Sequence, residues 1–253
     1  NEPLVIARAA FERRDRSALV ALRQRLSAQG DPLAMWVDYW ELHLRLRQAT
    51  QNDLEAFYAR WPGTLLEERL REDWILERGK HRDMKTLLAE LPRVVSFDDR
   101  EVECYSLLLR QQAGEDVAAR ARELWFAQRE ADHGCAWLVE SLFKANQLTR
   151  EDLWARSRLA AEQGRRYVAQ QAIALLRSVK AEAVHQVFLQ PGRYLSARRA
   201  QPSSDEAELT VLAIIRLSAR HPQAAAAVRQ VVADVADQMR ERVRGASPDY
   251  AAA

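Results

Sequence analysis

The stretch "LAAEQGRRYVAQQAIALL", from Leu159 to Leu176, shows the pattern that decides the fold. One glycine, Gly164, stands between two segments whose apolar residues recur at three- and four-residue steps, which is the spacing of one helix face. Glycine costs about 1 kcal/mol inside a helix relative to alanine, whereas just past a helix end it supplies a left-handed turn that other residues resist. The stretch therefore predicts a helical hairpin with its corner at Gly164.

The same hairpin pattern occurs twice more in the chain. Gly79 in "ILERGKHRDMKTLLAEL" and Gly114 in "LLLRQQAGEDVAARARELW" each precede a short polar turn and another apolar series at helical spacing. Proline is typical of the remaining turns, because it removes a helical hydrogen bond unless it lies near a first turn. Such prolines are Pro32, Pro62, Pro92, Pro191, Pro202 and Pro222. Ser203 or Ser204 is the expected N-cap of the helix that follows Pro202.

These repeated helix pairs predict the fold class. Pairs at intervals of about 30 to 45 residues are typical of an α-solenoid, in which each pair buries its apolar face only by stacking on its neighbours. Almost nothing alternates with a period of two over strand length, so we expect no sheet. The expected fold is all-α, an irregular α-α superhelix of about 13 to 15 helices. Because no linker-like stretch interrupts the pattern, we expect one domain over residues 1–253.

The charge pattern of the chain argues against nucleic acid as a partner. The chain has 38 Lys and Arg against 36 Asp and Glu, interleaved in runs such as "EERLRED", which is typical of a solvated, salt-bridged surface and not of a nucleic-acid interface. Arg198 and Arg199 could contact an anion, although a solvated helix end is the commoner role of such a pair. No run of apolar residues is long enough to span a membrane. The absence of a signal peptide decides nothing, because a mature secreted protein has lost it.

The two cysteines leave two alternatives open. Cys104 and Cys135 lie about one two-helix repeat apart, so they could face each other on neighbouring hairpins. A disulfide there would contribute on the order of 3 to 4 kcal/mol and would persist only in an oxidising compartment. The alternative is two buried free thiols in a cytosolic protein. His133 beside Cys135 does not complete a four-ligand zinc set, so we expect neither a metal site nor a cofactor.

The order of certain residues resembles the N-terminal superhelical domain of the soluble lytic transglycosylases over roughly residues 30–180. The matching residues are Tyr39-Trp40, Phe57, Trp61-Pro62, Leu70-Arg71, Trp74, Gly79, Cys104, Gly114, Leu124-Trp125, Cys135, Leu142-Phe143, Leu148-Thr149, Trp154 and Gly164. The chain departs from the family at Trp61, where tyrosine is usual, at Ala136, where aspartate is usual, and at Arg165, where asparagine is usual.

The resemblance implies a periplasmic enzyme of bacterial cell-wall turnover. The family cleaves the β-1,4 bond between N-acetylmuramic acid and N-acetylglucosamine in peptidoglycan and releases 1,6-anhydromuramoyl products. Its catalytic glutamate belongs to a C-terminal lysozyme-like domain, in an "ES" motif followed by "GLMQ" and "AYNAG". Glu140-Ser141 repeats only the first of these motifs, so we assign Glu140 to an ordinary helix and expect no catalytic residue in this chain.

The resemblance and the residues together predict a scaffold domain with a Cys104–Cys135 bridge and without the family's catalytic domain. Its expected partners are that catalytic domain and, through it, glycan strands. The histidines are isolated along the chain, and the tryptophans lie at apolar helical positions, where we expect core packing; Trp61, in a turn, is the exception. Two alternatives remain: a free-standing helical-repeat adaptor of the tetratricopeptide kind that binds a protein or peptide, and a regulatory domain of the same cell-wall machinery.

Overall fold

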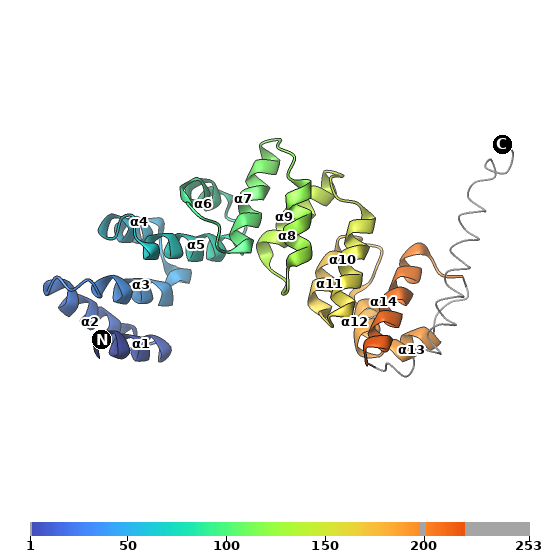
Figure 1. The fold of residues 1–253 in the computed structure, drawn as a ribbon, viewed down its shortest axis with the longest axis horizontal. Coiled ribbons are helices and arrows are strands. Elements are labelled where there is room, and N and C mark those ends of the chain that lie inside the picture. The colour runs from blue at the N-terminus through green and yellow to red at the C-terminus, as the bar shows by residue number, and fades with distance from the viewer. Residues whose placement is uncertain (1, 198–200, 221–253) are drawn as a thin grey trace. The chain divides into compact units, whose positions relative to one another are not determined.

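The computed structural model describes residues 2–197 and 201–220. That part of the chain contains 14 α-helices, two short 3-10 helices and no strand (Figure 1), which confirms the all-α class and the expected number of helices. The α-helices are α1 (Glu2–Glu12), α2 (Arg16–Ala28), α3 (Ala34–Leu44), α4 (Gln51–Arg60), α5 (Leu65–Gly79), α6 (Met84–Glu90), α7 (Arg100–Gln112), α8 (Ala118–Ala127), α9 (His133–Lys144), α10 (Arg150–Glu162), α11 (Arg166–Ala174), α12 (Ala181–Leu189), α13 (Pro191–Ser196) and α14 (Ser204–Arg220). The 3-10 helices are η1 (Leu46–Gln48) and η2 (Leu91–Arg93).

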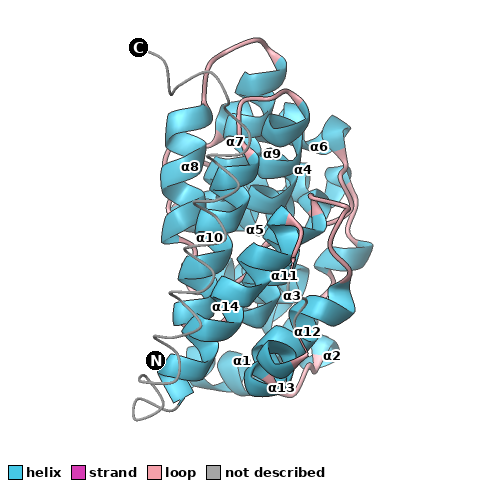
Figure 2. Cartoon of the chain, turned by 90° about the vertical axis from the view of Figure 1, so that its right-hand side faces the viewer, coloured by secondary structure: helices cyan, strands magenta, loops and turns pink. Residues whose placement is uncertain are grey.

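The helices form two compact units. Unit 1 comprises the residues up to Val117 together with His133–Leu138, and unit 2 comprises Ala118–Asp132 and the chain from Val139 onward. In unit 1, α2 packs on α1 and α3, and α5 packs on α3, α4, α6 and α7. In unit 2, α10 packs on α11 and α14, and α14 also covers α12 and α13. Figure 2 shows helices and loops, and no strand, in the part of the chain that the structure describes. The expectation of one domain over residues 1–253 stays a prediction.

The core of unit 1 consists of apolar clusters that successive helices share. Three adjoining apolar clusters lie between α1, α2 and α3, then between α3, α4 and α5, and then between α5, α6 and α7. Trp40 and Trp61 pack against both of the first two clusters. Each helix pair therefore buries its apolar face against its neighbours, as a helical repeat requires.

Two of the three predicted glycine corners are confirmed. Gly114 and Gly164 have φ angles of 91° and 74°, in the left-handed region that favours glycine. The corner after α5 is instead formed by Arg82, with a φ of 54°, and Asp83 then caps α6 by accepting the N–H of Thr86.

The prediction that Gly79 is a corner was therefore wrong. Gly79 is the last residue of α5, is buried, and does not have a positive φ. A Cβ atom at this position would lie 2.2 Å from Cζ of Tyr105 on α7. The glycine is needed because α5 and α7 approach each other closely there, and an apolar pattern in sequence does not distinguish close packing from a turn.

Gly79→Ala is expected to lower the free energy of unfolding by about 1 to 3 kcal/mol, because the fully buried ring of Tyr105 has to move away from the new methyl group. Urea denaturation followed by circular dichroism measures the change. Gly192→Ala is the matched control, since a Cβ there meets open space in α13 and no loss of stability is expected. Equal effects of the two substitutions would contradict the close-packing role.

The predicted proline turns are confirmed where the structure describes them. Pro32 and Pro62 lie between helices, Pro92 lies in η2, and Pro191 begins α13. Pro202 precedes α14, whose N-terminal cap is made by Ser203: its hydroxyl accepts the N–H of Glu206 while its own N–H donates to the Glu206 carboxylate. Pro222, Arg198 and Arg199 lie outside the described residues.

Acid is expected to weaken unit 2 through Asp152. The Arg122 guanidinium, 2.7 Å away, and hydrogen bonds from Thr149 lower the pKa of Asp152 to about 2. Because this folded value lies below the unfolded value of about 3.9, the stabilisation is complete above pH 4 and is lost as pH falls towards 2. Asp152→Asn should cost about 1 kcal/mol at pH 6, after solvent screening, and progressively less on acidification. The urea denaturation midpoints of the wild type and of Asp152→Asn, compared between pH 6 and pH 2.5, measure this loss of stability. A difference between the two midpoints that does not change with pH would contradict the role of Asp152.

Candidate functional site

A disulfide joins two helices of unit 1. Cys104 on α7 and Cys135 on α9 are linked, with their Cα atoms 4.9 Å apart, and both residues are fully buried. The pairing expected from the sequence is therefore present, and the alternative of two free thiols is excluded.

Hydrogen bonds reinforce this joint beside the disulfide. The Glu101 carboxylate of α7 accepts the backbone N–H groups of His133 and Gly134, at 3.1 and 3.0 Å, where α9 begins. A negative charge at this end of a helix is favourable, because the first N–H groups have no partner within the helix. The hydroxyl of Tyr105 donates to the same carboxylate at 3.0 Å. Sequence reasoning missed Glu101, because nothing in its local pattern shows that it caps a helix more than 30 residues away.

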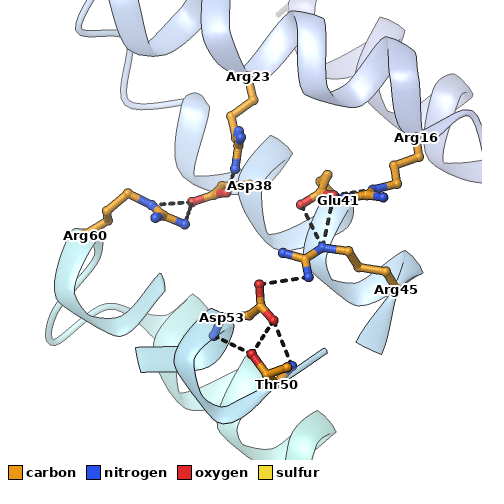
Figure 3. Close-up of polar contacts among 8 residues, drawn as sticks. All are labelled: Arg16, Arg23, Asp38, Glu41, Arg45, Thr50, Asp53 and Arg60. Atoms are coloured by element: carbon orange, nitrogen blue, oxygen red, sulfur yellow. Dashed lines mark hydrogen bonds and ion pairs between the residues drawn. The ribbon is translucent and has the colours of Figure 1, made fainter. Parts of the chain in front are cut away.

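Two buried carboxylates of α3 tie together the helices around it (Figure 3). Asp38, only 2% exposed, accepts hydrogen bonds from Arg23 of α2 at 2.8 Å and from Arg60 of α4 at 2.9 Å. The indole N–H of Trp61 donates to the same carboxylate at 2.9 Å. Trp61, whose role was open in the sequence, therefore has a structural partner.

The second carboxylate, Glu41, has a similar set of partners. It accepts from Arg16 of α2 at 2.6 Å and from Arg45 at 3.2 Å. Arg45 in turn lies 2.9 Å from Asp53, which belongs to the capping box that Thr50 forms at the start of α4 (Figure 3). Charged groups thus connect α2, α3 and α4 without leaving either buried carboxylate unpaired.

The charge run "EERLRED" is not a wholly solvated surface, and the prediction is corrected for one residue. Arg71 in this run is buried and pairs with Glu90 of α6 and Glu67 of its own helix. Arg71 lies on the face of α5 that packs against α4 and α6. A run of interleaved charges in the sequence does not show which of its residues lie on this buried face and which lie on the solvent-exposed face.

Glu140 forms an ion pair within its own helix. Its carboxylate lies 2.5 Å from Nζ of Lys144, one turn along α9, and neither residue lines any of the three hollows described below. Of the predicted core tryptophans, Trp74, Trp125 and Trp154 are buried. Trp36, Trp40 and Trp137 are half-buried and pack against the edges of the apolar clusters. Within residues 2–197 and 201–220, no three His, Cys, Asp or Glu side chains are grouped so as to hold a metal ion. No described helix is long and apolar enough to cross a membrane.

Two hollows flank α5 in unit 1, and most of the charges that line them have partners in the protein. In a hollow of about 470 Å³ between α1, α3 and α5, His43 Nδ1 lies 3.0 Å from Asp73, and Lys80 lies 3.1 Å from Glu77. The other hollow, of about 390 Å³, is strongly acidic.

The carboxylates of this acidic hollow hold the loop that precedes α7. Glu68 accepts the N–H of Val95 at 3.2 Å. Burial raises the pKa of Glu72, and the backbone N–H groups of Asp98 and Asp99 partly offset that rise. Asp99 itself caps α7. These acidic side chains therefore have a structural role.

A third hollow lies in unit 2, between α12, α13 and α14, and has a volume of about 340 Å³. Its lining combines amide, guanidinium, phenol and carboxylate groups, from Gln186, Gln190, Arg193, Tyr194 and Glu206. Among the described residues, Gln186 and Tyr194 of this lining make no side-chain hydrogen bond within the protein, and the hollow is the candidate ligand site.

Comparison with known proteins identifies the fold. No protein-family model and no curated protein matches the chain. Among solved structures, the chain is similar to an inactive mutant of the lytic transglycosylase Slt from Pseudomonas aeruginosa, with a TM-score of 0.53 and 21% identity. It is also similar to the 70-kDa soluble lytic transglycosylase in complex with bulgecin A, with a TM-score of 0.56 and 17% identity.

These similarities include nearly all of this chain but a minor part of the other proteins. They cover 93% and 94% of this chain, and 38% of each of the two solved chains. The fold is thus an all-α helical repeat. More particularly, it is a fold found within soluble lytic transglycosylases.

Proposed function

We propose that this chain is a non-catalytic scaffold domain of a periplasmic soluble lytic transglycosylase that acts on peptidoglycan. The observation that carries the proposal is the fold similarity to two lytic transglycosylases over 93% and 94% of the chain. The order of family residues around Cys104 and Cys135 supports it, because the structure joins these two cysteines. The buried disulfide also favours an oxidising compartment such as the periplasm.

The contacts of unit 1 suit a scaffold. The disulfide, the Glu101 cap and the buried carboxylates of α3 each link helices of successive hairpins. Such links resist local opening, because breaking any one of them exposes a buried group to solvent or leaves it without a partner. In the proposed enzyme this stiffness holds the catalytic domain and shapes the access of glycan strands. Cleavage of the MurNAc-β-1,4-GlcNAc bond, with 1,6-anhydromuramoyl products, then belongs to a catalytic domain elsewhere in the parent enzyme.

Mass spectrometry of products released from purified murein tests this proposal. The 253-residue chain alone should release no 1,6-anhydromuropeptides, whereas the product of the whole gene should release them, and Glu140→Gln in that product should leave the rate unchanged. Release by the chain alone would overturn its non-catalytic role. Absence of release by the whole gene product would overturn the assignment to lytic transglycosylases and favour the helical-repeat adaptor.

A further inference from the structure

We propose that the hollow between α12, α13 and α14 binds the glycan of peptidoglycan at muramic acid residues whose lactyl carboxylate is free, that is, glycan without stem peptides. The choice of glycan rests on the proposed function, whereas the hollow and its chemistry do not. At about 340 Å³ it lies within the usual size range of small-ligand sites.

The polar groups of this hollow are available to a ligand. Among the described residues, the amide of Gln186 and the hydroxyl of Tyr194 line the hollow without a hydrogen bond to another side chain or to the backbone. Arg193 makes no ion pair with any residue that the structure describes, and its one hydrogen bond to these residues, with Gln190, is long at 3.4 Å. The two hollows beside α5 differ, because most of their charged groups pair with other side chains or with the backbone.

An amide and a phenol are suited to sugar hydroxyl and acetamido groups. Each can both donate and accept hydrogen bonds, as sugar hydroxyls do. Burial, and then the nearby Glu206 carboxylate, raise the pKa of Tyr194, so its hydroxyl keeps its proton at neutral pH. The ring of Tyr194 is half-buried and lines the hollow, where its exposed part offers an apolar surface for the C–H face of a sugar ring.

The hollow carries one positive and one negative side chain, Arg193 and Glu206. Glu206 uses its carboxylate in the cap of α14, where it accepts the N–H of Ser203 at 2.7 Å. Arg193 is exposed and can form a charge-assisted hydrogen bond with a carboxylate. A stem peptide is joined to the lactyl group through an amide bond, so the lactyl carboxylate is absent where a peptide is attached. Only glycan that has lost its peptides presents the lactyl carboxylate that Arg193 would recognise. A reaction that removes stem peptides must therefore supply this ligand.

Calorimetric titration of the 253-residue chain tests the site. The probes are the disaccharide GlcNAc-MurNAc with its free carboxylate and the same disaccharide as its lactyl carboxamide. The free acid should bind with a Kd below about 1 mM, and the carboxamide about tenfold more weakly. Arg193→Gln should remove this preference while the carboxamide binds as before. Tyr194→Ala should weaken both ligands about tenfold or more.

Two controls separate binding from folding. Tyr194→Phe retains the ring and should fold as the wild type does, yet lose part of the affinity. Tyr167→Ala removes a tyrosine of α11 that is 69% exposed and outside the hollow, so it should not change binding. The proposal is overturned if no binding is detected at disaccharide concentrations up to 10-fold above the expected Kd of about 1 mM. Equal affinity for the two disaccharides, or equal effects of Tyr194→Ala and Tyr167→Ala, would also overturn it.

Failure of this site is distinguishable from failure of the proposed function. If the whole gene product releases 1,6-anhydromuropeptides while the chain does not bind the disaccharide, the site is wrong and the function stands. If the chain binds the disaccharide as expected while the whole gene product releases none, the site stands and the assignment to lytic transglycosylases is wrong.

Discussion

Glu90→Ala is expected to lower the free energy of unfolding by about 3 to 5 kcal/mol, which is the usual cost of removing one partner from a buried ion pair. The side chain of Glu90 is 0% exposed and that of Arg71 is 4% exposed, and their charged groups lie 2.5 Å apart. Gln51 donates to the other oxygen of the same carboxylate, also at 2.5 Å. The alanine variant leaves a guanidinium in the interior with Glu67 as its remaining carboxylate partner.

Urea denaturation of unit 1, followed by tryptophan fluorescence, measures the effect of Glu90→Ala. Glu55→Ala is the control, because this glutamate pairs with Arg93 while 46% exposed and should change stability by no more than about 1 kcal/mol. The double variant Arg71→Met/Glu90→Leu should regain much of the loss, since an apolar pair leaves no buried charge. A loss below about 1 kcal/mol for Glu90→Ala would contradict this account of the buried pair.

Removal of the disulfide by Cys104→Ala/Cys135→Ala is expected to cost about 3 to 4 kcal/mol. The bridge closes a loop of 31 residues, and in the chain-entropy account its main effect is to restrict the unfolded chain. Both cysteines are fully buried, so the double alanine variant also loses the packing of two sulfur atoms.

Denaturation with and without dithiothreitol separates the bond from the packing. The reductant should destabilise the wild-type chain to nearly the level of the variant, and it should not affect the variant itself. Equal stability of the wild-type chain under both conditions would contradict a stabilising role for the disulfide. The backbone hydrogen bonds from His133 and Gly134 to Glu101 remain in the variant, so α9 should still form.

Much of the secondary structure could be predicted from sequence because it depends on local physics. The apolar spacing around Gly114 and Gly164 identifies helix pairs, and both glycines have the left-handed backbone that a corner needs. Ser203 caps α14 as expected for serine after Pro202. The Cys104–Cys135 pair could be proposed because a two-helix repeat brings equivalent positions of successive hairpins together.

The candidate site could not be predicted in the same way. Gln186 and Tyr194 are ordinary polar residues of two different helices, and no motif connects them. Their shared hollow exists because α14 packs on both α12 and α13. The chemistry of such a hollow depends on which side chains already have partners, and that is a property of contacts across helices.

By itself, the sequence determined the all-α class, the helix pairs and most of their corners, since helix periodicity and turn residues act over a few neighbouring positions. Only the tertiary structure decided which polar residues are buried and what they bind. It assigned Gly79 to close packing against Tyr105, and Asp38 to the arginines of two other helices. The physical reason is that burial and ion pairing depend on the face a helix presents to its neighbours, and residues far apart in the chain form that environment.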